Sequence, residues 1–222
     1  IYVIPYTSII EQNAGVFRNV LGDGNVLEHH SGVEFDLSDG ASPEEIRRAL
    51  ASENWDMPLV VTTAARFFDS LYANRSSKCR KLHNLANSVI IFDEAQMLPL
   101  CHLRPCVAAM ASLAEHVGST LVWCTATQPS LGDLLRTYAP EHTVTELCPQ
   151  TEEVYDRFRR VTFRQAGILE DDALAERLSG HRQVLCVVNS RKAAQQIFDR
   201  LPQEGSFHLS TLMIPAQRQM IL

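Results

Sequence analysis

Short apolar runs alternate with longer amphipathic stretches along most of this chain, and this rhythm constrains the fold more than any other feature of the sequence. The runs are rich in β-branched residues, and several lack polar alternation, as in Val89–Phe92, which is typical of strands buried on both faces. The stretches between them repeat apolar residues at helical spacing. The sequence therefore predicts an α/β fold, a parallel sheet with helices on both faces.

Each expected element is placed by its own pattern. The strands that we expect are Ile1–Pro5, Leu59–Thr63, Ser88–Asp93, Thr120–Thr125, Val161–Arg164, Gln183–Asn189 and Phe207–Ser210. The expected helices are Thr7–Leu21, Pro43–Ser52, Ala64–Ala73, Leu103–His116, Ser130–Tyr138, Asp172–Leu178 and Arg191–Leu201. Turn formers and charges interrupt the rhythm near residues 139–160, so we place one domain over 1–150 and a second over 151–222. Because the chain starts inside a strand and stops inside a helix-like stretch, we expect a fragment.

Composition narrows the class of protein. Hydrophobic residues make up 45% and charged residues 21% of the 222 residues, which suits a globular chain with a real core. No apolar run approaches the ~20 residues that cross a bilayer, and we expect a soluble, cytoplasmic protein without membrane contact. The net charge of −6 argues against coating nucleic acid through global charge. Any nucleic-acid contact must come from local patches.

Two acids, Asp93 and Glu94, directly follow the apolar run Val89–Phe92, and the amide Gln96 comes two positions later. Ligands of parallel sheets collect at the carboxyl ends of the strands. There, Asp93 can hold the Mg²⁺ of a nucleotide, and Glu94 can orient or deprotonate an attacking water. The alternative is a pair of solvated turn acids, which is common after a strand.

A second polar turn, Thr125-Ala-Thr127, follows the apolar strand that ends near Trp123. The hydroxyls of Thr125 and Thr127 could hydrogen-bond the acidic motif and change partners when the γ-phosphate leaves. Such a link would couple hydrolysis to motion. Capping of the next helix by Thr127 is the simpler alternative, and both can hold.

With these residues in view, the sequence resembles a superfamily-two helicase, and more narrowly the CRISPR-associated helicase-nuclease of type I interference systems. The similarities, in chain order, are Tyr2–Gln12 to motif Ia, Val60–Thr63 to motif Ib, Asp93–Gln96 to the DEAH-type motif II, Thr125–Thr127 to motif III, Cys186–Ala194 to motif IV and His208–Arg218 to the segment after it. The stretch Asn74–Asn84 is similar to this particular family rather than to helicases in general.

The resemblance implies a RecA-like first domain joined to the beginning of a second RecA-like domain. It implies ATP and Mg²⁺ as cofactors, stepping along single-stranded DNA, and a CRISPR surveillance complex as partner of the complete protein. Gln96 departs from the commoner His of motif II, although it can still donate and accept hydrogen bonds. The sequence has no G-x-x-x-x-G-K-[ST] loop and no His-Asp dipeptide. The resemblance places the phosphate loop before Ile1 and the arginine-bearing motif VI beyond Leu222, so we expect the fragment alone to be inactive.

Two sets of residues are candidates for nucleic-acid contact. Short hydroxyl side chains at strand-to-helix turns suit backbone phosphates, with helix capping as the alternative; they are Thr7, Ser8, Thr62 and Thr63. The basic residues are Arg75, Lys78, Arg80 and Lys81, together with Arg191 in the motif IV segment. A basic cluster is also typical of a solvated loop.

Two other functions stay open from the sequence alone. A generic DNA or RNA helicase is one, and a folded binding module that hydrolyses nothing is the other.

Overall fold

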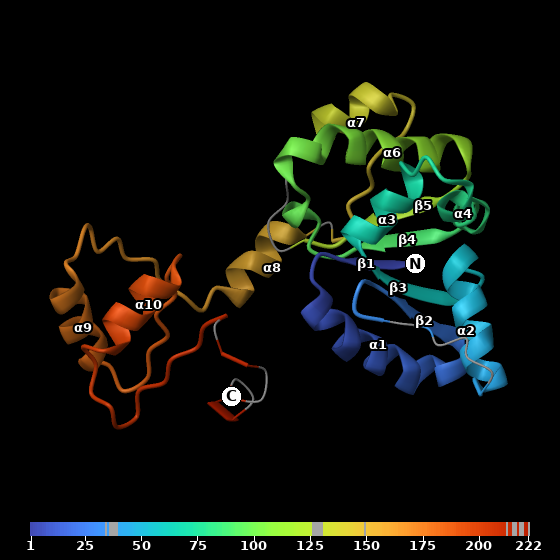
Figure 1. The fold of residues 1–222 in the computed structure, drawn as a ribbon. Coiled ribbons are helices and arrows are strands. Elements are labelled where there is room, and N and C mark those ends of the chain that lie inside the picture. The colour runs from blue at the N-terminus through green and yellow to red at the C-terminus, as the bar shows by residue number, and fades with distance from the viewer. Residues whose placement is uncertain are drawn as a thin grey trace. The chain divides into compact units, whose positions relative to one another are not determined.

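The computed structural model of this chain describes residues 1–33, 35, 40–125, 131–148, 150–211, 213–214, 217 and 220–221. It divides into two compact units, Ile1–Leu147 and Cys148–Leu222. The first unit holds a five-stranded sheet with helices around it (Figure 1). Every strand pairing in this sheet is parallel, which confirms the predicted α/β fold.

The strands are β1 (Tyr2–Ile4), β2 (Val26–His29), β3 (Leu59–Thr63), β4 (Val89–Phe92) and β5 (Thr120–Trp123). Their order across the sheet is β2-β3-β1-β4-β5, so β1 lies in the centre. The pattern did not predict β2, because its second half is polar and it lies at the edge of the sheet. Since all strands run the same way, the carboxyl ends of β1, β3, β4 and β5 lie at the same end of the sheet.

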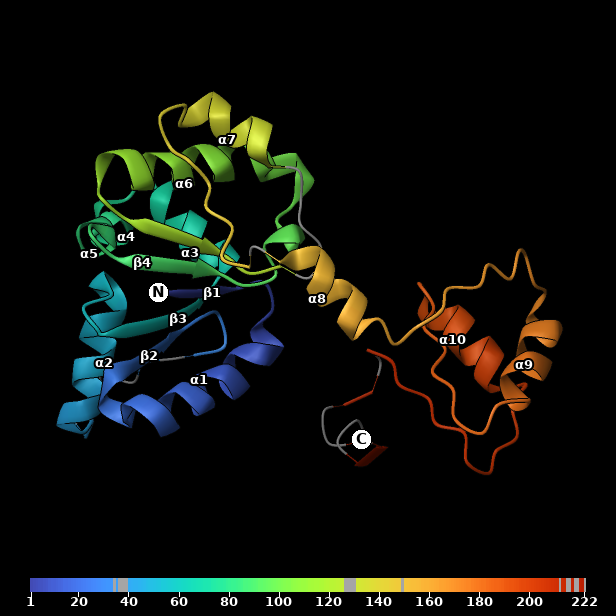
Figure 2. The same ribbon diagram turned by 180° about the vertical axis from the view of Figure 1, so that it is seen from behind.

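The helices of the first unit are α1 (Thr7–Leu21), α2 (Pro43–Asn54), α3 (Ala64–Leu71), α4 (Ser76–Cys79), α5 (Leu82–Leu85), α6 (Leu103–His116) and α7 (Gly132–Tyr138). Short 3₁₀ turns, η1 (Asp23–Asn25), η2 (Ala95–Met97) and η3 (Leu100–His102), complete the unit. Helix α1 covers one face of the sheet, while α3 and α6 cover the other (Figure 2).

Consecutive strand residues are buried on opposite faces, which explains the lack of polar alternation. Val3 packs in the cluster with Phe67 of α3 and Met110 of α6, while Ile4 packs in the cluster with Ile10 of α1. All five are at most 1% exposed. This two-sided core fixes the register of β1 against its neighbours, because a slip by one residue would exchange the faces.

The second unit contains α8 (Thr151–Phe158), α9 (Asp171–Ser179) and α10 (Arg191–Phe198), and its described residues include no strand. The strands predicted over 161–164, 183–189 and 207–210 were therefore wrong. A strand is stable only when it is paired and covered on a face, and this segment offers no paired neighbour. Leu185 and Val187 accordingly remain 85% and 82% exposed. That this unit begins a second RecA-like domain remains a prediction.

No helix in the described parts of the chain has both the length and the apolar character needed to span a bilayer.

Candidate functional site

The acidic turn, residues 93–96, follows the end of β4 and lies at the end of the sheet where the strands have their carboxyl ends. The N–H of Asp93 still donates to the carbonyl of Val3 over 2.9 Å, so the sheet fixes the backbone up to this residue. Glu94 then adopts a left-handed conformation with φ 50° and ψ 46°. A non-glycine residue there costs of order 1–3 kcal/mol, and such strain clusters at functional sites. The residue with this strained backbone is Glu94, for which the sequence analysis predicts activation of the attacking water.

Both oxygens of the Asp93 carboxylate are engaged. Oδ1 accepts the N–H of Glu94 over 3.0 Å, and Oδ2 accepts the hydroxyl of Tyr2 over 2.8 Å. Burial, and then the hydrogen bond to the negative Asp93, raise the pKa of Tyr2. Sequence reasoning gave Tyr2 no role, because its meeting with Asp93 depends on the pairing of β1 with β4 and has no local signal.

A chain of hydrogen bonds joins the acidic turn to the turn after β5. The hydroxyl of Thr125 donates to Oε1 of Gln96, and Nε2 of Gln96 donates to Oε2 of Glu94. The backbone adds a second tie, from the N–H of Ala95 to the carbonyl of Cys124 over 3.2 Å. The structure thus brings together the two polar turns that the sequence linked. Thr127 lies outside the described residues.

The acidic turn fits a magnesium ion that is held jointly with a nucleotide. Within the described residues, no group of three or more His, Cys, Asp or Glu side chains could hold a metal ion. Magnesium is, however, commonly bound by one or two carboxylates together with substrate phosphates. Asp93 and Glu94 are half-buried oxygen donors of this kind, and each oxygen of Asp93 keeps a lone pair beyond its one hydrogen bond.

The hydroxyls at the end of β3 bind within the protein. Thr62 is fully buried, and its hydroxyl donates to the carbonyl of His29 over 2.7 Å. Thr63 is 7% exposed and caps α3 by accepting the N–H of Arg66 over 3.2 Å. For Thr63 this contact is the helix capping that was the alternative, and for both side chains these contacts disfavour phosphate contact. Thr7 and Ser8 form the first turn of α1, and only their backbone is described.

The basic cluster divides into exposed and buried members. Lys78 pairs with Asp69 over 2.8 Å and Arg80 with Glu53 over 2.7 Å, both at the surface. Arg75 is exposed, and its guanidinium has no hydrogen-bond or ion-pair partner within the described chain.

Lys81 differs from its three neighbours because it is buried. Its ammonium lies 5.7 Å from the ring centre of Trp55. Burial, and then the nearby Arg66, lower its pKa. Cation–π packing is therefore the role that the structure gives Lys81, and phosphate contact by this side chain is disfavoured. Arg191, the first residue of α10 in the second unit, is exposed.

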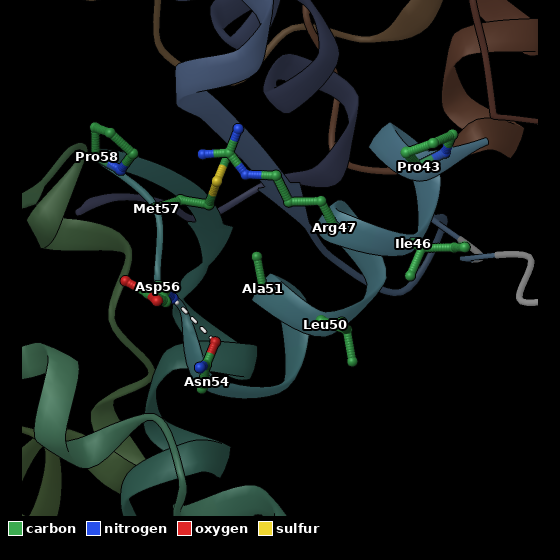
Figure 3. Close-up of a pocket in the computed structure, with 9 residues that line it drawn as sticks. All are labelled: Pro43, Ile46, Arg47, Leu50, Ala51, Asn54, Asp56, Met57 and Pro58. Carbon is green, nitrogen blue, oxygen red and sulfur yellow. Dashed lines mark hydrogen bonds between the residues drawn. The ribbon is translucent and has the colours of Figure 1, made fainter.

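Residues of α2 and of the segment 56–58 line a hollow that does not include the acidic turn (Figure 3). It has a volume of about 700 Å³ and is open to solvent, between one side of α2 and the segment 56–58. That segment leads into the amino end of β3, and Asp93 lies at the opposite end of the sheet, where the strands have their carboxyl ends. The hollow is therefore separate from the candidate site.

Comparisons with known proteins bear on this arrangement. Residues 1–134 match the DEAD/DEAH box helicase family, a range that includes the whole sheet and the acidic turn. The chain is also similar to the CRISPR-associated nuclease/helicase Cas3 of Haloferax volcanii, with 28% identity over 145 residues. This similarity covers 59% of the chain but 16% of the Haloferax protein, so the chain spans a small part of that relative's length.

Proposed function

This chain belongs to the DEAD/DEAH box helicase family, and on that premise we propose that it is part of an ATP-dependent translocase that acts on single-stranded DNA in CRISPR interference. The observation that carries the proposal is the acidic turn at the carboxyl end of β4, hydrogen-bonded to Thr125 after β5. The similarity to the Haloferax Cas3 and the segment 74–84 support the CRISPR assignment.

In this proposal, Asp93 holds the Mg²⁺ that accompanies ATP. The ion neutralises charge on the phosphates when it is bound. Glu94 accepts a proton from the attacking water or orients it, and its left-handed backbone sets the direction of its carboxylate independently of Asp93. Hydrolysis therefore depends on two adjacent carboxylates with different tasks.

Gln96 and Thr125 couple this chemistry to movement. Because Gln96 bonds to Glu94 and Thr125 at once, a shift of the Glu94 carboxylate on phosphate release changes the hydrogen bonds of the turn after β5. The three side chains form a polar link with two arrangements, which hydrolysis switches.

Single-stranded DNA is contacted through phosphates in this proposal. The candidates for these contacts are the cations Arg75, Lys78 and Arg80, the backbone of the first turn of α1 at Thr7 and Ser8, and, in the second unit, Arg191. Such contacts carry no base identity, as movement along any sequence requires.

Glu94→Gln in the full-length protein that carries this chain tests the proposal. Loss of the carboxylate should reduce DNA-stimulated ATP hydrolysis about 10²–10⁴-fold, because general-base catalysis contributes about that much. Binding of a non-hydrolysable ATP analogue should stay nearly unchanged, since Asp93 remains. Glu141→Gln, at an exposed position with no side-chain partner in the described chain, is the matched control and should hydrolyse normally.

Three outcomes would contradict the proposal in different ways. Normal hydrolysis by Glu94→Gln would make Glu94 a solvated turn acid. Equal stimulation by RNA and by DNA would favour a generic helicase. DNA binding without any hydrolysis by the unsubstituted protein would favour a binding module.

A further inference from the structure

Tyr2 of β1 makes a long-range contact with the acidic turn that the roles above leave unexplained. Its hydroxyl donates to Asp93 from 91 positions away in the sequence. The sheet builds this contact, because Tyr2 lies opposite Ile91 of β4, and Asp93, two residues further on, projects from the same face as Ile91. The contact follows from strand register and does not depend on loop geometry.

The ring of Tyr2 is itself held in place. It packs edge-on against Phe17 of α1, with ring centres 5.1 Å apart and planes at 66°. Both rings border the core cluster that contains Ile4 and Ile10. Packing therefore fixes the ring that carries the hydroxyl, and the side chain loses little conformational freedom when the hydrogen bond to Asp93 forms.

From this geometry we infer that Tyr2 is a positioning residue, which fixes the rotation at which the Asp93 carboxylate meets Mg²⁺. The inference rests on the proposed function. With Oδ1 held by the N–H of Glu94 and Oδ2 by Tyr2, the carboxylate cannot turn about its terminal bond, a torsion that is otherwise broad. Magnesium demands near-octahedral geometry, so the orientation of its ligand matters.

Tyr2→Phe in the full-length protein removes the hydroxyl and keeps the ring against Phe17. Residues that orient a metal ligand change metal affinity or activity by about 10–100-fold when they are replaced. We therefore expect the Mg²⁺ concentration for half-maximal binding of a fluorescent, non-hydrolysable ATP analogue to rise about tenfold or more. ATP hydrolysis should show the same shift in its Mg²⁺ dependence.

Tyr72→Phe is the matched control. It deletes the same group, a tyrosine hydroxyl, at an exposed position where the hydroxyl donates to the carbonyl of Pro105 over 2.6 Å and not to Asp93. It should leave the Mg²⁺ midpoint unchanged, and the melting temperature of each variant reports the purely structural cost.

The outcomes separate the two claims. An unchanged Mg²⁺ midpoint in Tyr2→Phe, beside normal Mg²⁺-dependent binding by the unsubstituted protein, would leave Tyr2 a packing residue and overturn the inference alone. Absence of Mg²⁺-dependent nucleotide binding by the unsubstituted protein would overturn the proposed function and the inference with it.

Discussion

His29, the last residue of β2, is a single side chain whose protonation the fold changes. Its Nδ1 accepts the indole N–H of Trp55 over 3.0 Å, and the two rings meet edge to face. Burial lowers the pKa of His29 to about 4, and the positive charges of Lys81 and Arg66 add to the effect. The imidazole is therefore neutral in the folded protein at any pH near neutrality.

This pKa predicts how stability depends on pH. Between about pH 6.5 and 4, the unfolded chain binds a proton at His29 that the folded chain does not, so the free energy of unfolding should fall as the pH falls. The slope from one proton is at most about 1.4 kcal/mol per pH unit. His29→Asn keeps an acceptor for Trp55 and should flatten the slope, as measured by urea unfolding at several pH values. His142→Asn, at an exposed position, should leave the slope as it was; equal slopes in both variants would contradict this prediction.

At the scale of elements, the segment 74–84 carries the test of nucleic-acid contact. Each DNA phosphate that the protein no longer neutralises should lower the magnitude of the log–log salt slope for single-stranded DNA by about 0.7, so Arg75→Ala alone should lower it by that amount. Replacing Arg75, Lys78 and Arg80 together should lower it by up to about 2. Lys81→Met should leave the slope unchanged, because the Lys81 ammonium is buried over Trp55.

Fluorescence anisotropy of a labelled single strand at several salt concentrations measures these slopes. Arg136→Ala removes an exposed arginine of α7 and is the control for a general loss of charge. If the salt slope falls as much in Arg136→Ala as in Arg75→Ala, the segment 74–84 is a solvated loop that does not contact DNA.

Elements with a strong period could be predicted from the sequence. The structure has α1 and α6 with the predicted bounds, because their apolar residues repeat every three to four positions and face the sheet. The predicted strands of the second unit failed because an apolar run does not form a strand without a paired neighbour.

The candidate site shows the same division. The place of Asp93 and Glu94 could be predicted, because it follows from one strand and its end. The contact with Tyr2 could not, since it requires the register between β1 and β4.

At the scale of the whole molecule, the two units differ in how much apolar surface they bury. The core of the first unit extends over both faces of its sheet. In the described part of the second unit, the buried apolar residues are Ala175, Leu178 and Ile197. Because burial of apolar surface is the main source of stability, the second unit should open far more readily than the first.

Limited trypsin digestion should reveal this difference. We expect early cleavage after Arg159, Arg160 and Arg164, which lie in an exposed stretch without regular structure, and a resistant fragment that retains residues 1–147. Mass spectrometry of the fragments checks the sites.

Met110→Ala in the core of the first unit should lower the free energy of unfolding by about 2–5 kcal/mol and make the fragment 1–147 sensitive to trypsin as well. Equally fast cleavage within both units of the unsubstituted chain would contradict the expectation.

The left-handed backbone at Glu94 has a consequence for protein engineering. Glycine adopts such a conformation without strain, so Glu94→Gly removes a steric cost that the native residue bears. A screen that rewards heat tolerance alone would therefore favour the loss of the carboxylate on which the proposed hydrolysis depends. Selection for thermostability should therefore favour glycine at position 94, whereas selection for activity should keep the glutamate.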